Sequence, residues 1–277
     1  MRIAPALAVL LVSATGHANK EKLAPGLAEI VAAERAFAKR CGEVGIRDSF
    51  LEFFAADGVS FAPDPGLAHA RLEKRPKKTP DPTVELDWAP MRAEISAAGD
   101  LGWTSGNATF ERSSKEPKSM GYYFSLWRKQ PDGGWKVVLD IGVDSPPKAF
   151  AKETVVTPLG PKSSAPPAAV DAAAIKKLDA EFCARSATDA PAAYRAALAD
   201  NAVRNHQGLL PATSKKAILG TVKKGGRACT PSEAFVSTGL AYTYGSWEGD
   251  GEKGYYARVW RWDGDWRIAA EVDSLLK

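Results

Sequence analysis

The chain contains one motif twice, at widely separated positions. Residues 121–128 read GYYFSLWR and residues 254–261 read GYYARVWR, so Tyr122 and Tyr255 stand 133 positions apart (255 − 122). Each copy is followed by a glycine-containing turn and a tryptophan. A repeat of this length is too long for a stacked solenoid unit and corresponds to a whole domain. The sequence therefore predicts two similar domains in tandem.

The first residues have the layout of an export signal. Arg2 precedes an apolar run over residues 3–12, and small residues lead up to Ala18. This pattern is typical of a secretory signal peptide over residues 1–18, and the run is too short for a permanent membrane anchor. An ordinary N-terminal helix is the alternative interpretation. We therefore expect a periplasmic or secreted protein without a membrane anchor.

The three cysteines are Cys41, Cys183 and Cys229. An oxidising compartment permits a disulfide, but the odd count leaves at least one thiol free. Cys41 falls on the apolar stripe of a predicted helix, where we expect it to be buried as a small hydrophobic residue. A bond between Cys183 and Cys229 and two free thiols remain open as alternatives. The cysteine spacing resembles no metal site, so we expect no metal.

Composition argues against several classes of function. The 277 residues are 45% hydrophobic and 25% charged, with a net charge of +4, as in soluble globular proteins. The most basic stretch, residues 71–78, is predicted to be a solvated loop rather than a nucleic-acid surface. The sequence has no glycine-rich phosphate loop before a helix. We therefore expect neither a nucleic acid nor a cofactor as a partner.

Each repeat predicts helices first and strands afterwards. Apolar residues recur at helical spacing over residues 27–41 and 175–182, and a second short helix follows each of these. A third helix, over residues 214–224, is predicted in the second copy alone. Glycines in the turns at 132–134 and 263–264 tolerate positive φ and predict tight hairpins. The predicted strands, which hold all eight tryptophans, cover residues 83–97, 101–112, 120–129 and 135–143, and then 229–237, 240–248, 254–262 and 266–272.

Helices followed by long antiparallel strands define an α+β fold with the helices on one face. The order of a helix, a second helix, and a Trp-x-Arg strand followed by Asp-Gly-x-Trp resembles the SnoaL-like branch of the nuclear transport factor 2-like superfamily. The resemblance implies two cone-shaped domains, each with N-terminal helices packed on a curved antiparallel sheet and a pocket between them. We expect these domains at residues 19–145 and 171–277, joined by a proline-rich linker over residues 146–170. Members include isomerases, dehydratases, polyketide cyclases and non-catalytic binding modules, so the fold alone does not select a function.

Strand alternation sorts side chains onto the two faces of each sheet. One set in the repeated motif is apolar in both copies, and we expect it to face the helices: Tyr122, Phe124 and Leu126, and Tyr255, Ala257 and Val259. The opposite set mixes aromatic and polar groups and is expected on the sheet backs. Trp127, Trp260 and Arg258 are therefore predicted to contact a partner surface, either the other domain or a second copy of the chain. By the same alternation, Asp140 and Glu271 are expected to point away from the cones.

The predicted hollows would suit a small apolar or aromatic ligand, with a plain packed core as the alternative. The expected pocket residues are Trp103, Asn107, Tyr122, Phe124, Tyr242 and Tyr255. No catalytic residue is assigned. An isomerase-like site needs a carboxylate base inside an apolar cavity, and Asp144 or Asp273 would supply it only if a bulge reversed the alternation of the last strand.

His69 and His206 have no counterpart in the other repeat, and we expect structural or solvated roles for them. The sequence thus favours an exported, non-catalytic small-ligand-binding or interaction protein. A ketosteroid-isomerase-like or dehydratase-like enzyme is the alternative.

Overall fold

The structure is a computed structural model that describes residues 23–77, 85–111, 118–148, 150–152, 154–160 and 170–276. The predicted signal peptide, residues 1–18, and the centre of the predicted linker, residues 161–169, lie outside these residues. Within the described part of the chain, no helix has both the length and the apolar character needed to cross a membrane.

Each half starts with helices and continues into a sheet. The described elements of the first half are α1 (Pro25–Val44), α2 (Ile46–Phe53), β1 (Phe54–Phe61), β2 (Pro65–Leu67), α3 (Ala68–Leu72), β3 (Glu85–Ile95), β4 (Leu101–Glu111), β5 (Ser119–Lys129), β6 (Trp135–Asp144) and β7 (Thr157–Pro158). Those of the second half are α4 (Ala172–Thr188), α5 (Ala190–Ala197), β8 (Leu198–His206), α6 (Lys215–Leu219), β9 (Ala228–Ser237), β10 (Leu240–Gly249), β11 (Glu252–Trp262) and β12 (Trp266–Asp273).

Local sequence signals explain where the long helices begin and end. Pro25 occupies the first position of α1, where its missing N–H costs nothing, and Gly45 ends the helix with a φ of 85°. Asp171 caps α4, since its carboxylate accepts a hydrogen bond from the Ala174 N–H. The apolar stripe of α1 is buried as predicted, and it includes Cys41.

The strands form two sheets, one in each half. The order is β2-β1-β6-β5-β4-β3-β7 in the first and β8-β12-β11-β10-β9 in the second. The long hairpins are antiparallel as expected, whereas β1 pairs with β6 and β8 with β12 in parallel. The α+β prediction is therefore confirmed, and all eight tryptophans lie in strands. Three short elements were not predicted: β2 and α3 in the first half, and β7, which pairs part of the predicted linker with β3.

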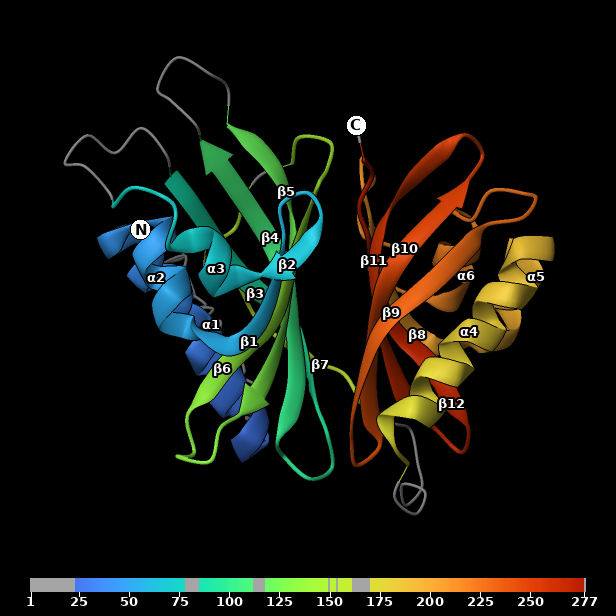
Figure 1. Ribbon diagram of the computed structural model, residues 1–277, viewed down its shortest axis with the longest axis horizontal. Helices are drawn as coiled ribbons and strands as arrows, with labels where there is room; N and C mark the ends of the chain where they lie inside the picture. Colours follow the sequence, from blue (N-terminus) through green and yellow to red (C-terminus); the bar gives the residue numbers. More distant parts are fainter. Residues whose placement is uncertain are drawn as a thin grey trace, which may run out of the picture.

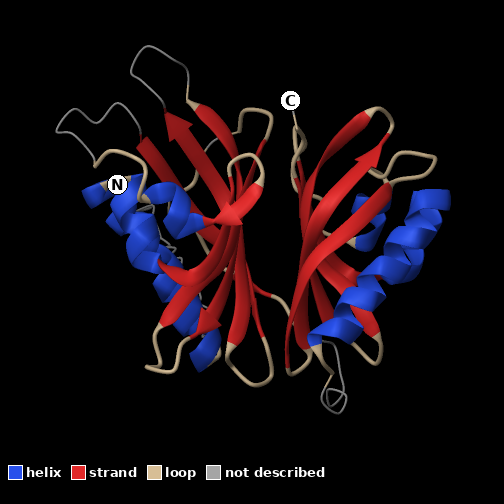
Figure 2. Cartoon of the chain, viewed as in Figure 1, coloured by secondary structure: helices blue, strands red, loops and turns tan. Residues whose placement is uncertain are grey.

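The two halves stand with the backs of their sheets against each other. Helices α1 and α2 lie on one outer side, α4 and α5 on the opposite outer side, and the sheets lie between them (Figures 1 and 2). We call the space between the helices and the sheet of the first half the first cone, and its equivalent in the second half the second cone. Each cone has its own apolar cluster. A third cluster lies between the sheet backs and draws residues from both halves.

The predicted assignment of the sheet faces is wrong. In the repeated motif, the side chains expected to face the helices face the other sheet, and those expected on the sheet backs lie under the helices. Trp127 belongs to the cluster under the first-half helices and Trp260 to the cluster under the second-half helices. Tyr122, Phe124 and Leu126 instead belong to the cluster between the sheet backs. The physical reason is that both faces of each sheet are buried, so an apolar set of side chains does not identify the face under the helices.

A bulge in the last strand of each sheet contributes to this reversal. The pairing of β5 with β6 steps from Leu126↔Leu139 to Trp127↔Val137, which leaves Val138 as an extra residue. The pairing of β11 with β12 steps in the same way around Ala269. A bulge inserts one residue and so changes which face the following side chains occupy. Asp140 and Glu271 therefore point into the cones, against expectation.

Candidate functional site

A buried carboxylate from α1 forms the centre of the first cone. Glu34 is inaccessible to solvent and accepts hydrogen bonds from Trp88 Nε1 at 2.5 Å, from Trp127 Nε1 at 2.8 Å and from the Thr104 hydroxyl. Burial raises the pKa of Glu34, and these hydrogen bonds only partly offset that effect. The donors come from three strands, so Glu34 ties α1 to the sheet and has little bonding capacity left for a ligand.

A second carboxylate of the first cone is less constrained. Asp140 lies on β6 opposite Ser125 of β5, whose hydroxyl donates a hydrogen bond of 2.9 Å to Asp140 Oδ2. Asp140 is half-buried, and the described residues place no Lys, Arg or His within ion-pair distance of it. Burial, and secondly the negative charge of Glu34, raise the pKa of Asp140 to about 7, although the Ser125 hydrogen bond acts in the opposite direction.

Asp140 lines a cavity of about 510 Å³. The walls on the cone side carry aromatic rings, namely Phe50, Trp88 and Tyr123. The Tyr123 hydroxyl is buried, and it has no hydrogen bond of normal geometry among the described residues. Burial raises its pKa, whereas an interaction with the Thr104 hydroxyl acts to lower it. A buried hydroxyl without a well-formed hydrogen bond is uncommon and costs free energy, so a polar atom of a ligand at this place would stabilise the site.

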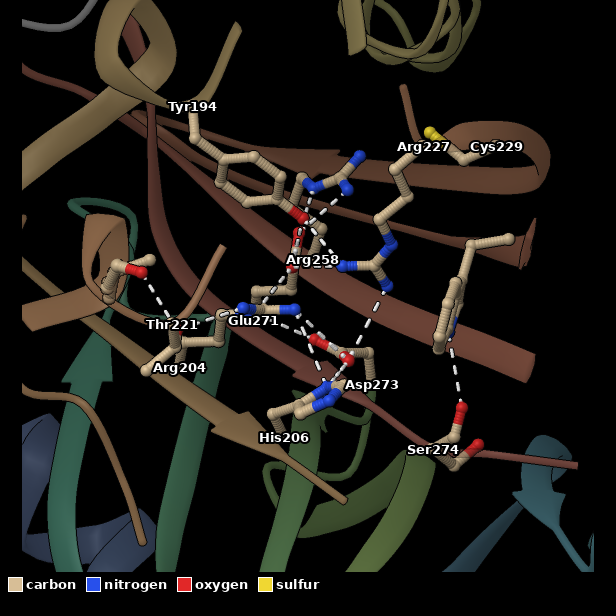
Figure 3. Close-up of polar contacts among 12 residues, drawn as sticks. Tyr194, Arg204, His206, Thr221, Arg227, Cys229, Arg258, Glu271, Asp273 and Ser274 are labelled. Atoms are coloured by element: carbon tan, nitrogen blue, oxygen red, sulfur yellow. Dashed lines mark hydrogen bonds and ion pairs between the residues drawn. The ribbon is translucent and has the colours of Figure 1, made fainter. Parts of the chain in front are cut away.

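The second cone contains a cation, Arg258, at the position where the first cone has Ser125. Arg258 lies between two buried carboxylates: its Nε donates to Glu271 at 2.7 Å, and its Nη1 pairs with Asp179. Tyr256 donates to Asp179 at 2.7 Å and Tyr194 donates to Glu271 at 2.5 Å. Figure 3 shows Tyr194, Arg258 and Glu271 converging from different elements. These five side chains are almost completely buried.

A further ion cluster lies toward the mouth of the second cone. Asp273 accepts a 2.9 Å hydrogen bond from Arg204 Nε, is bonded to His206, and lies 3.5 Å from Arg227 Nη2 (Figure 3). Burial opposes ionisation of Asp273, but the arginines outweigh it and lower its pKa. Arg227 stacks on the Trp247 ring at 3.9 Å. The cavity beside this cluster is only about 40 Å³, so little space is left around these charged side chains.

The two cones correspond residue by residue. The first helix of each half places a carboxylate three positions before a phenylalanine, in the pairs Glu34–Phe37 and Asp179–Phe182. The tryptophan of the repeated motif donates to an equivalent threonine, in the pairs Trp127–Thr104 (3.3 Å) and Trp260–Thr243 (3.1 Å). Asp140 pairs across the strand with Ser125, as Glu271 does with Arg258. The decisive difference is therefore Ser125 in the first cone and Arg258 in the second.

Five of the six predicted pocket residues do not line the 510 Å³ cavity. Trp103, Tyr122, Phe124 and Tyr242 belong to the cluster between the sheet backs. Tyr255 donates a 2.9 Å hydrogen bond to Asp64 of the other half, and Asn107 bonds the Ala151 carbonyl. Of the six, Tyr122 alone lines the 510 Å³ cavity, where that cavity passes over the end of the sheet. The predicted partner-surface residues Trp127, Trp260 and Arg258 lie inside the cones.

Sequence reasoning missed Glu34 and Asp179 altogether. A signal was available, because each is an acidic residue on the buried stripe of an amphipathic helix, where an unpaired charge is rare.

Of the two bases considered for an isomerase-like site, Asp273 is fully buried in the second cone, whereas Asp144 is exposed. The bond between Cys183 and Cys229 is present and ties α4 to β9. Among the described residues, no cluster of His, Cys, Asp and Glu could hold a metal ion.

No protein-family model matches this sequence, and no curated protein matches it. Several solved structures are similar to it. A nuclear transport factor 2-like protein of unknown function from Shewanella oneidensis is 14% identical, with a TM-score of 0.35 over 42% of this chain and 96% of its own. A ketosteroid isomerase-like protein from Erwinia carotovora atroseptica is 15% identical, with a TM-score of 0.36 over 45% and 100%. A nuclear transport factor 2-like superfamily protein from Salmonella enterica is 15% identical, with a TM-score of 0.32 over 46% and 96%.

Proposed function

We propose that the protein binds a small, largely apolar or aromatic ligand in the first cone. The observation that carries this proposal is a 510 Å³ cavity lined by Asp140 and by Tyr123, a tyrosine whose buried hydroxyl has no hydrogen bond of normal geometry among the described residues. The volume lies in the range of small-molecule sites, and aromatic walls with a few polar groups are typical of them. The cavity beside the ion cluster of the second cone measures only about 40 Å³, so we assign that cone a structural role.

The test uses 1-indanone, a small aromatic ketone whose oxygen can accept a hydrogen bond from Tyr123. Binding is measured by ligand-observed NMR and by the rise in melting temperature. We expect Tyr123→Phe to weaken binding about tenfold, because a hydrogen bond in a buried site contributes about 1 kcal/mol or somewhat more. The matched variant Tyr256→Phe, at the equivalent position of the second cone, should leave the affinity unchanged. Equal effects of both variants would contradict the assignment to the first cone.

A second candidate function is proton transfer, as in an isomerase or dehydratase. The observation that favours it is Asp140, whose pKa of about 7 suits a general acid or base at neutral pH. The experiment follows exchange of the α-protons of 1-indanone for deuterium in D₂O. If the wild-type protein accelerates this exchange and the Asp140→Asn variant does not, the result supports catalysis. Binding of 1-indanone without acceleration would leave the ligand-binding proposal standing and remove the catalytic one.

The place of action is proposed to be the periplasm or the extracellular space. The Cys183–Cys229 disulfide supports this, since such bonds persist in oxidising compartments, and so does the apolar run that ends at Ala18. N-terminal sequencing of protein made in a Gram-negative host should start near Asn19. A cytoplasmic product that still starts at Met1 would refute the proposal.

A further inference from the structure

The second cone shows which side chains surround a buried cation in this arrangement. The Arg258 guanidinium lies between the carboxylates of Asp179 and Glu271, with its central carbon 4.2 Å from the centroid of the Phe182 ring and 4.4 Å from that of Tyr256. Two anions and two aromatic faces around one cation form a strong recognition site, because ion pairing and cation–π attraction act together where water is excluded.

The first cone repeats this framework without the cation. Phe37 and Trp127 meet edge to face at 6.2 Å, as Phe182 and Trp260 do. The carboxylates Glu34 and Asp140 correspond to Asp179 and Glu271, and Tyr123 corresponds to Tyr256. Ser125 stands where the second cone has Arg258, so the first cone lacks a positive charge at this position.

Not every part of the first-cone framework is free to bind. Glu34 is saturated by its indole and hydroxyl donors, and Trp88 fills part of the space beside it. Asp140 accepts its single described hydrogen bond from Ser125 and lines the cavity. The Tyr123 hydroxyl has no acceptor of normal geometry among the described residues, whereas the Tyr256 hydroxyl donates to Asp179. The groups that line the cavity are therefore the Asp140 carboxylate, the rings of Phe50 and Trp88, and the Tyr123 side chain.

From this comparison within one chain, we infer that the ligand of the first cone carries a cationic amine or amidine group on an aromatic or apolar body. The cation takes the role that the Arg258 guanidinium has in the second cone and pairs with Asp140. The Tyr123 hydroxyl and the aromatic walls hold the rest of the ligand. This inference rests on the proposed ligand-binding function and names the chemical class of the ligand.

The test compares benzamidine, which is a cation at pH 8, with benzamide, a neutral molecule of the same shape. We expect benzamidine to bind the full-length mature protein at least about tenfold more tightly, as a charge-assisted hydrogen bond requires. Asp140→Asn should reduce this preference to about one. The control variant Glu73→Gln removes an exposed carboxylate outside the cavity and should leave the preference unchanged.

A second variant tests the role of the missing arginine. Ser125→Arg places a guanidinium at the position in the first half that is equivalent to Arg258 in the second half, so it should abolish benzamidine binding. If Ser125→Arg fails to fold, Asp140→Asn still decides the question. Equal binding of benzamide and benzamidine, or a preference that survives Asp140→Asn, overturns the inference while leaving ligand binding intact. Failure of benzamidine, benzamide and 1-indanone to bind would overturn the proposed function as well.

Discussion

At the scale of single residues, the two halves differ most in whether their buried carboxylates are paired with cations. The second cone matches three carboxylates with three guanidinium groups, drawn from Asp179, Glu271 and Asp273 and from Arg204, Arg227 and Arg258. The first cone holds two carboxylates and, among the described residues, no cation paired with either. Burying an unpaired charge is costly, so the first cone favours protonated carboxyls when it is empty.

Asp140 should therefore make the stability of the protein depend on pH. Its pKa is about 7 in the folded protein against an ordinary value of 3.8, so between these pH values the folded state binds a proton that the unfolded state has released. The free energy of unfolding consequently falls as the pH rises through this window. Between pH 5 and pH 8 we expect the wild type to lose about 2–3 kcal/mol relative to Asp140→Asn. Urea unfolding at both pH values measures this, and parallel behaviour of the two proteins would show that Asp140 is not perturbed.

Arg258 makes a contrasting prediction. Arg258→Met leaves Asp179 and Glu271 buried without their shared counter-charge, so we expect a loss of about 3–5 kcal/mol in the free energy of unfolding. The equivalent change in the first half, Ser125→Ala, removes one hydrogen bond and should cost about 1 kcal/mol. Similar losses for the two variants in urea unfolding would mean that the second cone tolerates an unpaired charge.

At the scale of elements, the disulfide links the helix layer of the second half to its sheet. Cys183 on α4 and Cys229 on β9 are 46 positions apart, and β9 is an edge strand. A cross-link over such a loop restricts the unfolded chain and typically stabilises by about 2–4 kcal/mol. The double variant Cys183→Ala, Cys229→Ala should therefore melt at a lower temperature than the wild type. A reducing agent should lower the melting temperature of the wild type alone, and an equal shift in both proteins would point to an effect elsewhere.

At the scale of the whole molecule, the contact between the sheet backs makes the two halves interdependent. Its cluster takes Phe124 and Leu139 from one half and Tyr242 and Val259 from the other. A buried ion pair, Arg261 Nη1 to Glu94 Oε1 at 3.2 Å, crosses the same contact. Separation would expose this apolar surface to water, so the halves should strongly favour staying together.

A protease site inserted within residues 161–169 tests this interdependence. After cleavage we expect the two fragments to co-elute in gel filtration as one particle of the size of the intact protein. Glu94→Gln should weaken the association, because it leaves Arg261 unpaired. Two separate, cooperatively folded monomers after cleavage would show that each half has a self-sufficient core.

The sequence by itself determined the repeated motif, the order of the long helices and strands, the hairpin turns at Gly133 and Gly264, and the burial of Cys41. These features depend on local periodicity and backbone preference, which short stretches of sequence carry. The same information missed the short helix α3, since five residues are too few to show a helical period.

Only the tertiary structure decided which face of each sheet lies inside its cone. Alternation shows that two faces exist, but helices bury one face and the other sheet buries the opposite one, so apolar character does not distinguish them. The bulges at Val138 and Ala269 then move Asp140 and Glu271 into the cones. The candidate site also joins residues far apart in the sequence, as Glu34 and Trp127 are, 93 positions apart. Such pairings arise from packing between elements, which no local sequence pattern encodes.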